Sequence, residues 1–188
     1  MLRGLRYGLE LAMALQYCHD EAFEAYRVLH RDIKPKNIGL VNSGGTDRLV
    51  LFDFGISKLV RRDQQGWQDG VQMTGMCGSL RYMAPEVATC KRYNHKSEAY
   101  SFGLLLWEMI AHERPYEGMP TEEFENRVCK AGVRPRLERT WHPLLKDLLT
   151  STFEPDFRAR PEFELLVEDL QTLVASISFN PASAYSGS

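Results

Sequence analysis

The stretch "VLHRDIKPKN", residues 28–37, places six polar or charged side chains between two apolar runs: His30, Arg31, Asp32, Lys34, Lys36 and Asn37. Enzymes that move a phosphoryl group need a carboxylate to accept a hydroxyl proton, oxygen ligands for Mg²⁺ and a cation near the phosphate. Asp32 is a candidate for the carboxylate, Lys34 for the cation and Asn37 for a metal ligand. The stretch therefore predicts the machinery of phosphoryl transfer.

A short β-hairpin is predicted directly after this stretch. Two apolar runs, residues 38–41 and 49–52, flank the sequence "NSGGTD", in which two adjacent glycines are a strong turn signal. The hairpin leads into "LFDFG", where Asp53 ends a strand and Gly55 allows the backbone to turn. Asp53 is thus a candidate for a second metal ligand.

Helical patterns account for most of the remaining chain. Residues 2–17 have the spacing of an amphipathic helix, and residues 97–111 are apolar nearly all round, as in a central buried helix. We expect Thr121 to cap a helix, and Pro143 and Pro161 to be first helical residues. A polar loop is predicted over residues 55–78, and a surface bulge over residues 20–27. The predicted fold class is mostly α with a small β-hairpin.

Composition limits the class of protein. The 188 residues are 44% hydrophobic and 26% charged, which is enough to bury one sizeable core. The 23 basic and 25 acidic residues are mixed along the chain, so no nucleic-acid surface is predicted. No long apolar segment or signal sequence indicates membrane insertion. Four cysteines without a CxxC pair favour a reducing, cytoplasmic location, and the scattered histidines do not predict a zinc site.

We expect one domain over residues 1–176. Residues 177–188 end the chain in small and polar side chains, which are typical of a disordered tail.

Three motifs in this order resemble the large carboxy-terminal lobe of a eukaryotic-type protein kinase. His30-Arg31-Asp32, with Lys34 and Asn37, is similar to the catalytic loop of that family. Asp53-Phe54-Gly55 resembles its metal-binding motif, and "APE", residues 84–86, the end of its activation segment. The resemblance extends from about residue 2 to residue 174, and it implies ATP and Mg²⁺ as cofactors and a protein as the substrate.

The resemblance also implies structural roles. His30, Phe54 and Gly55 would support the site, Glu86 would pair with Arg160, and Glu98 would hold the backbone of the His30-Arg31-Asp32 turn. Family members usually have an aspartate in place of Glu98. The alternative interpretation is that Asp32, Asn37 and Asp53 are only loop and turn residues.

Smaller features indicate the substrate class. Lys34 resembles the serine/threonine kinases, and Ser79 matches the small hydroxyl residue that contacts their catalytic aspartate. The runs "YSFGLLLWEMI" and "GVRPRL" resemble the tyrosine-kinase-like branch of the serine/threonine kinases. We therefore expect transfer to serine or threonine, with dual specificity as the open alternative.

Charge in the same region suggests regulation. In the family, the arginine at the position of Arg31 pairs with a phosphate on the activation segment, and Lys58 stands where a second cation often joins it. Thr74 is the favoured site of that phosphate, and Ser57 is a weaker one. Alternatively, nearby acids neutralise both cations and Thr74 is an ordinary loop residue.

The chain departs from the family in what precedes its helix at residues 2–17. The glycine-rich loop, the VAIK-type lysine and the helix glutamate of the amino-terminal lobe are not found in the sequence. In addition, Gly39 replaces a bulky aliphatic residue beneath the adenine, which predicts a gap there.

Two hypotheses follow. In the first, the chain is the catalytic lobe of an active kinase, and the missing amino-terminal lobe is its partner. This lobe alone is then expected to be inactive. Alternatively, it is a catalytically inactive module for protein binding or regulation. Leu2, Ile38, Leu40 and Phe54 are expected to be uncovered in a lone lobe, and we favour the first hypothesis because these positions are apolar.

Overall fold

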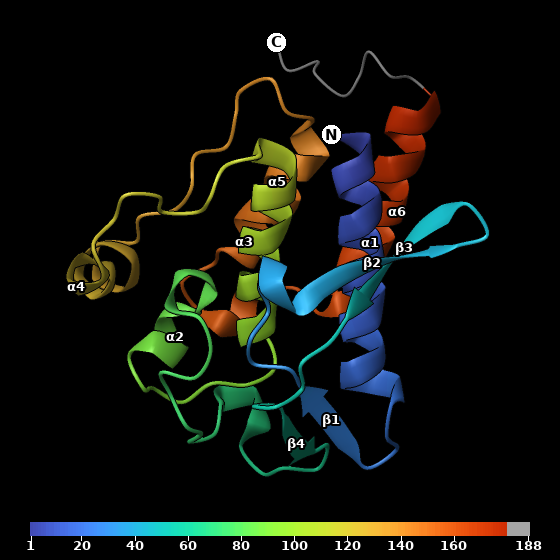
Figure 1. Ribbon diagram of the computed structural model, residues 1–188. Coiled ribbons are helices and arrows are strands. Elements are labelled where there is room, and N and C mark those ends of the chain that lie inside the picture. The colour runs from blue at the N-terminus through green and yellow to red at the C-terminus, as the bar shows by residue number, and fades with distance from the viewer. Residues whose placement is uncertain (180–188) are drawn as a thin grey trace.

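Three long helices form the framework of the computed structural model, which describes residues 1–179: α1 (Leu2–Gln16), α3 (Ser97–Ala111) and α6 (Phe163–Phe179). Helix α1 packs against both α3 and α6 (Figure 1). Gly4 and Gly8 make the approach to α3 possible. A Cβ atom on Gly8 would lie 2.5 Å from Leu106 Cδ1, and one on Gly4 would lie 2.8 Å from the carbonyl oxygen of Met109. These two glycines are therefore packing residues.

Helix α3 is the centre of the core, and its predicted bounds and burial are confirmed. Its residues 97–100, 102–107 and 110 are all buried. Leu5, Leu11 and Leu15 from α1 and Leu166, Leu170 and Leu173 from α6 share this core. Burial on every side explains why the sequence of α3 shows an apolar run and not a one-sided stripe.

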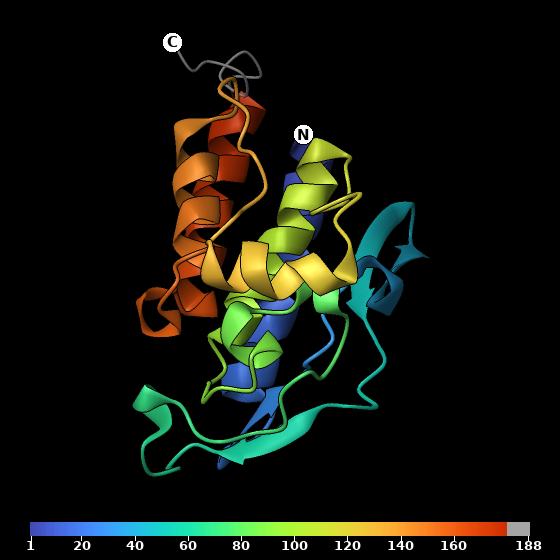
Figure 2. The same cartoon turned by 90° about the vertical axis from the view of Figure 1, so that its left-hand side faces the viewer.

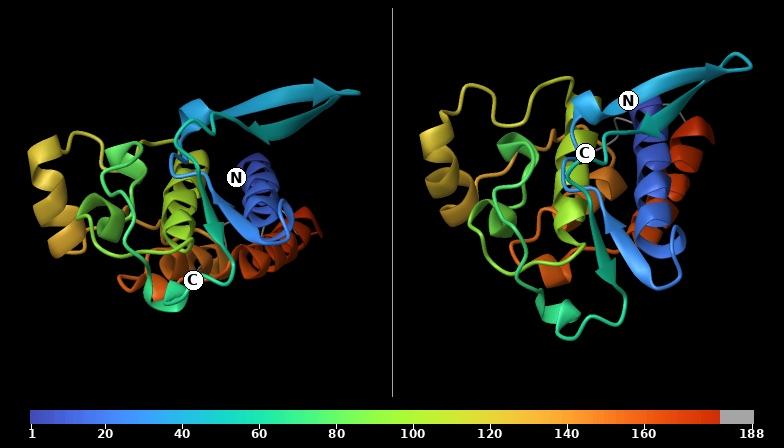
Figure 3. Two further views of the ribbon diagram at one scale, coloured as in Figure 1. Left: turned by 90° about the horizontal axis from the view of Figure 1, so that it is seen from below. Right: turned by 60° about the horizontal axis from the view of Figure 1, so that its bottom comes forward.

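The predicted hairpin is also confirmed. Strands β2 (Ile38–Ser43) and β3 (Thr46–Leu51) pair antiparallel, with Ile38 opposite Leu51. Gly44 and Gly45 form the turn with φ angles of +60° and +86°, which side chains disfavour. Seen from below, the hairpin extends along one edge of the molecule, above α1 (Figure 3).

A second two-stranded sheet was not predicted. Strands β1 (Tyr26–Leu29) and β4 (Lys58–Arg61) pair antiparallel, with Leu29 opposite Lys58. The predicted loop over residues 55–78 therefore contains a strand, and the predicted bulge at residues 20–27 leads into one. Both strands have four residues and mixed polarity, so only their pairing over a long sequence separation identifies them.

The remaining helices are α2 (Pro85–Ala88), α4 (Thr121–Phe124) and α5 (Pro143–Thr152), and π-helical turns at residues 17–21 and 125–130 extend α1 and α4. Helix α4 and the turn after it lie across the front of α3 in the view of Figure 2. Pro143 is the first residue of α5, as predicted, and the His142 ring caps that helix by accepting from the Leu144 N–H.

Three predictions about helix ends were wrong. Thr121 is the first residue of α4 and not its cap, because Pro120 takes that position. Pro161 precedes α6 by two residues, since the helix begins at Phe163. The tail does not begin at residue 177, because Ile177 is 3% exposed in the core and α6 continues to Phe179. Residues 180–188 of the predicted tail lie outside the described residues.

No helix in residues 1–179 combines the length and apolar character needed to cross a membrane.

Candidate active site

The His30 ring organises the turn that carries the candidate catalytic residues. His30 is 0% exposed, and its Nε2 lies 3.0 Å from the carbonyl oxygen of Phe52. Its Nδ1 accepts the N–H of Asp32 at 3.3 Å. Since Nδ1 accepts, Nε2 carries the proton and donates to Phe52, which defines one neutral tautomer. The ring of Phe54 packs edge-on against the His30 ring, with centroids 4.8 Å apart. His30 therefore joins the catalytic-loop motif to the Asp53-Phe54-Gly55 motif.

Glu98 at the start of α3 holds the next residue of the turn. Arg31 has a φ of +71°, and its N–H donates to Glu98 Oε1 at 2.5 Å. The other oxygen of Glu98 lies 2.6 Å from Nε2 of the buried His19. The contact that the resemblance implied is therefore present, with glutamate in place of aspartate. Sequence reasoning missed His19, because nothing in its spacing from Glu98, 79 residues away, indicates contact.

Asp32 lies in the turn with its carboxylate 10% exposed. The Lys34 ammonium pairs with Asp32 Oδ2, and Asn37 Nδ2 donates to the same oxygen at 3.1 Å. Partial burial raises the pKa of the Asp32 carboxyl, but Lys34 and the neighbouring side-chain donors outweigh burial and hold this pKa below its usual value. Oδ1 of Asp32 is buried and has no hydrogen-bond partner among residues 1–179. This ionised oxygen is therefore unpaired, and it lies beneath the end of the 55–78 segment.

Residues 78 and 79 lie directly against this carboxylate. Gly78 has a φ of +99°, and a Cβ atom there would lie 2.4 Å from the carbonyl oxygen of Arg31 and 3.2 Å from Asp32 Oδ1. Ser79 lines the same small cavity as Asp32. Glycine is therefore required at position 78 for the end of the 55–78 segment to approach the turn.

Asp53 and Asn37 are brought together by the backbone. The N–H of Phe52 donates to the carbonyl oxygen of Asn37 at 3.0 Å, which places Asp53 beside Asn37. Asp53 is exposed, has a φ of +65°, and accepts the Gly55 N–H on Oδ1 at 3.3 Å. The amide nitrogen of Asn37 donates to Asp32, so its amide oxygen remains free.

This donor set fits Mg²⁺, which proteins bind through one or two carboxylates together with substrate phosphates and water. One exposed carboxylate and one amide oxygen are hard oxygen ligands. No group of three or more His, Cys, Asp or Glu side chains that could hold a metal occurs in residues 1–179. Asn37 and Asp53 would hold such an ion together with phosphate and water oxygens.

The predicted gap at Gly39 is partly filled. A Cβ atom on Gly39 would lie 3.1 Å from the ring of Phe52 and 3.7 Å from Val50 Cγ2. The ring of Phe52, the residue that follows the opposite strand β3, therefore lies against the position where the family usually has an aliphatic side chain.

The Arg31 side chain reaches the segment that carries Thr74. Its Nη2 donates to the carbonyl oxygen of Thr74 at 2.6 Å and to the hydroxyl of Tyr93 at 3.1 Å, and its buried Nε has no partner in the described part of the chain. Thr74 itself is exposed. Lys58 is half-buried on β4, opposite Leu29, and no ion pair is found for it or for Arg31 within residues 1–179.

Glu86 and Arg160 form a buried bidentate ion pair. Arg160 Nη1 lies 2.6 Å from Glu86 Oε1, and Nη2 lies 2.9 Å from Oε2. The Arg160 Nε donates to the carbonyl oxygen of Glu154 at 2.9 Å, and the guanidinium lies over the ring of Tyr100. The pair that the resemblance implied is present, and it fixes α2 to the segment that precedes α6.

The candidate carboxylate Asp32, cation Lys34 and metal ligand Asn37 thus meet in one turn, and the hairpin brings Asp53 beside it, an arrangement of the protein kinase type. The protein kinase domain model matches residues 4–170. The chain belongs to the protein kinase family.

Named relatives agree with this assignment. The chain is 35% identical over 171 residues to the serine/threonine-protein kinase VIK of Arabidopsis thaliana, an alignment that covers 90% of this chain and 37% of VIK. It is 31% identical to the serine/threonine-protein kinase STY46 (92% of this chain, 27% of STY46) and 30% identical to the serine/threonine/tyrosine-protein kinase HT1 (89% and 39%), both from the same plant. The chain spans roughly a third of the length of these relatives.

Proposed function

We propose that this chain supplies the catalytic residues of a serine/threonine protein kinase, which transfers the γ-phosphoryl group of ATP to a hydroxyl of a protein substrate. The single observation that carries the proposal is the carboxylate of Asp32. It is ionised and paired through Oδ2 with Lys34 and Asn37, and its buried Oδ1 has no hydrogen-bond partner within the described residues, which leaves that oxygen to a substrate hydroxyl once residues 78 and 79 move aside.

Each residue has a role that follows from its position. Asp32 Oδ1 orients the substrate hydroxyl and accepts its proton as the oxygen–phosphorus bond forms. Lys34 neutralises negative charge on the transferred group. Asn37 and Asp53 would hold Mg²⁺, which shields the phosphate charges when it is bound. Glu98 and His30 keep the turn in the geometry that these roles need.

Transfer to serine or threonine rests on Lys34 and on Ser79, the small hydroxyl residue beside Asp32. The relative HT1 is named a serine/threonine/tyrosine-protein kinase, so dual specificity is the alternative to be tested.

A second candidate function is a non-catalytic binding module. Exposed apolar side chains along the hairpin and in the segment directly after it favour this function, because exposed apolar surface marks contact sites. Leu40 is 49% exposed, Phe52 44% and Phe54 42%. In the kinase hypothesis the same surface is covered by an amino-terminal lobe.

The two functions are separated by one assay on the full-length gene product. With Mg²⁺, γ-labelled ATP and casein as the acceptor, we expect labelled phosphoserine or phosphothreonine after acid hydrolysis, and little phosphotyrosine. Equal phosphotyrosine would establish dual specificity. Absence of label, from a folded protein that binds casein, would support the binding module.

We also propose that phosphorylation of Thr74 activates the enzyme. Arg31 already reaches the Thr74 carbonyl oxygen and is free of acidic partners in the described residues, and Lys58 is the second available cation. A phosphate on Thr74 would gain charge-assisted hydrogen bonds from these cations and order the segment.

Phosphatase treatment of the active protein, or Thr74→Ala, is therefore expected to lower activity about tenfold or more, since one such hydrogen bond corresponds to roughly that factor. Mass spectrometry would identify the modified residue, and Ser57→Ala is the matched control. Full activity of the Thr74→Ala protein would exclude this regulation.

A further inference from the structure

Trp67 is a buried anchor in the middle of the 55–78 segment. It is 4% exposed, although Gln68 and Asp69 in the same short turn are exposed. Its indole N–H donates to His95 Nδ1 at 3.0 Å. The two rings lie side by side in nearly the same orientation, with centroids 5.6 Å apart and planes 9° from parallel, as an in-plane N–H···N bond requires. A buried tryptophan that donates its N–H to a partner is fixed in position and orientation.

His95 connects Trp67 to the segment before α6. His95 is 2% exposed, and its Nε2 lies 2.5 Å from Glu162 Oε2. Because Nδ1 accepts from Trp67, Nε2 carries the proton and donates to Glu162. Burial alone raises the pKa of the Glu162 carboxyl, but His95 and the nearby Lys96 ammonium lower it to about 2. The favoured state is a neutral ring between an indole donor and an ionised carboxylate.

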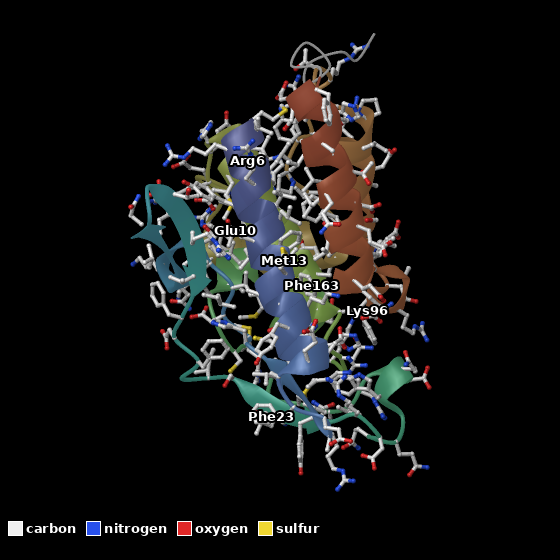
Figure 4. All side chains as sticks on the ribbon, turned by 90° about the vertical axis from the view of Figure 1, so that its right-hand side faces the viewer. Arg6, Glu10, Met13, Phe23, Lys96 and Phe163 are labelled. Carbon is white, nitrogen blue, oxygen red and sulfur yellow. The ribbon has the colours of Figure 1, made fainter. Side chains whose placement is uncertain are left out.

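The neighbouring backbone reinforces this arrangement. The Asn94 amide donates to the carbonyl oxygen of Trp67 at 3.2 Å. Lys96 Nζ lies 3.4 Å from Glu162 Oε1. Figure 4 shows Lys96 and Phe163 close together where the lower end of α6 lies beside α1. Trp67 is therefore held through its side chain and its backbone by the residues that lead into α3.

The same residues contact the support of the catalytic turn. The Glu98 N–H donates to the His95 carbonyl oxygen at 2.9 Å, in the first turn of α3. The His95 ring also packs edge-on against His19, with centroids 5.4 Å apart, and His19 binds Glu98 Oε2. Glu98 in turn holds the N–H of Arg31. A continuous chain of contacts thus runs from Trp67 to the residue before Asp32.

We propose that Trp67, His95 and Glu162 form a latch that holds the 55–78 segment against the start of α3 and thereby positions Glu98 and the Arg31–Asp32 turn. These three are positioning residues, since none of them contacts the carboxylate of Asp32. The latch is separate from the contact of Arg31 with Thr74, and it needs no phosphate. The 55–78 segment therefore has one constitutive anchor at Trp67 and one regulated contact at Thr74.

Amide hydrogen exchange, measured by NMR on the 188-residue chain, tests the latch without depending on catalytic activity. Trp67→Phe keeps an aromatic ring but removes the N–H donor and part of the ring volume, a volume change that the Trp141→Phe control also makes. Losing one buried hydrogen bond is expected to accelerate exchange of the Arg31 amide about fivefold to tenfold. Trp141→Phe is the matched control, because Trp141 is 5% exposed and has no contact with His95 or Glu98 among the hydrogen bonds and ring contacts of residues 1–179. It should leave Arg31 exchange unchanged.

A second pair of variants keeps the test independent of Trp67. Glu162→Gln retains an oxygen acceptor for His95 and should leave Arg31 exchange within about twofold of the original chain, whereas Glu162→Ala removes the acceptor and should accelerate it. The side chain of Glu162 is 43% exposed, so both variants are expected to fold. Faster exchange confined to residues 64–72 would overturn the proposal. Equal acceleration at Arg31 and at the core amide of Leu105 would overturn it too, because it would show only a loss of global stability.

Discussion

Asp32→Asn in the full-length gene product is expected to reduce phosphoryl transfer by about a thousandfold, within the range that general-base groups contribute. The amide keeps the shape of the side chain and its hydrogen-bond acceptor, but it cannot take a proton at neutral pH. Rates with γ-labelled ATP and casein provide the measurement. Because the position of the hydroxyl depends on the same group, both kcat and kcat/KM are expected to fall.

Asp63→Asn is the control for this substitution. Asp63 is 69% exposed and pairs with Arg61 on the surface, so its replacement makes the same chemical change away from the site. Its activity should equal that of the unmodified protein. Retention of more than a tenth of the activity by the Asp32→Asn protein would show that another group accepts the proton.

Arg160→Met is expected to lower the free energy of unfolding by about 3–5 kcal/mol, the usual consequence of leaving one buried charge of an ion pair without its partner. The Arg160 side chain is 0% exposed and that of Glu86 is 8% exposed, so water cannot replace the lost guanidinium. The carbonyl oxygen of Glu154 also loses its donor. Urea unfolding of the 188-residue chain, followed by circular dichroism, would measure the change.

Arg158→Met is a closely matched control. Arg158 lies two residues away and pairs with Asp156 at 2.8 Å, but its side chain is 59% exposed. Surface pairs contribute little, so a change below about 1 kcal/mol is expected. In addition, the double variant Glu86→Met with Arg160→Met should recover part of the lost stability, because no buried charge remains. Equal effects of the two arginine substitutions would show that burial does not determine the contribution of the Glu86–Arg160 pair.

The site residues could be predicted from the sequence because they lie in short, ordered motifs. Asp32, Lys34 and Asn37 fall within six residues, and this short spacing indicates that they share one turn, although distant groups such as Glu98 hold that turn in its geometry. The two adjacent glycines, Gly44 and Gly45, determined the hairpin. This hairpin brings Asp53 back beside Asn37. Likewise, the apolar run of residues 97–111 determined a buried helix, since periodicity is a local property.

Tertiary structure alone decided the pairing of distant segments. Strands β1 and β4 are four residues each, and within the described residues each has the other as its strand partner. The contacts of His19 with Glu98 and of Trp67 with His95 join residues 79 and 28 positions apart, and neither pair has a sequence signal. Gly39 looked like a gap because the ring that lies against it belongs to Phe52, 13 positions further along the chain and just past the opposite strand. Local sequence thus determined which groups could act, whereas burial and long-range packing, which depend on the whole chain, decided what holds them in place.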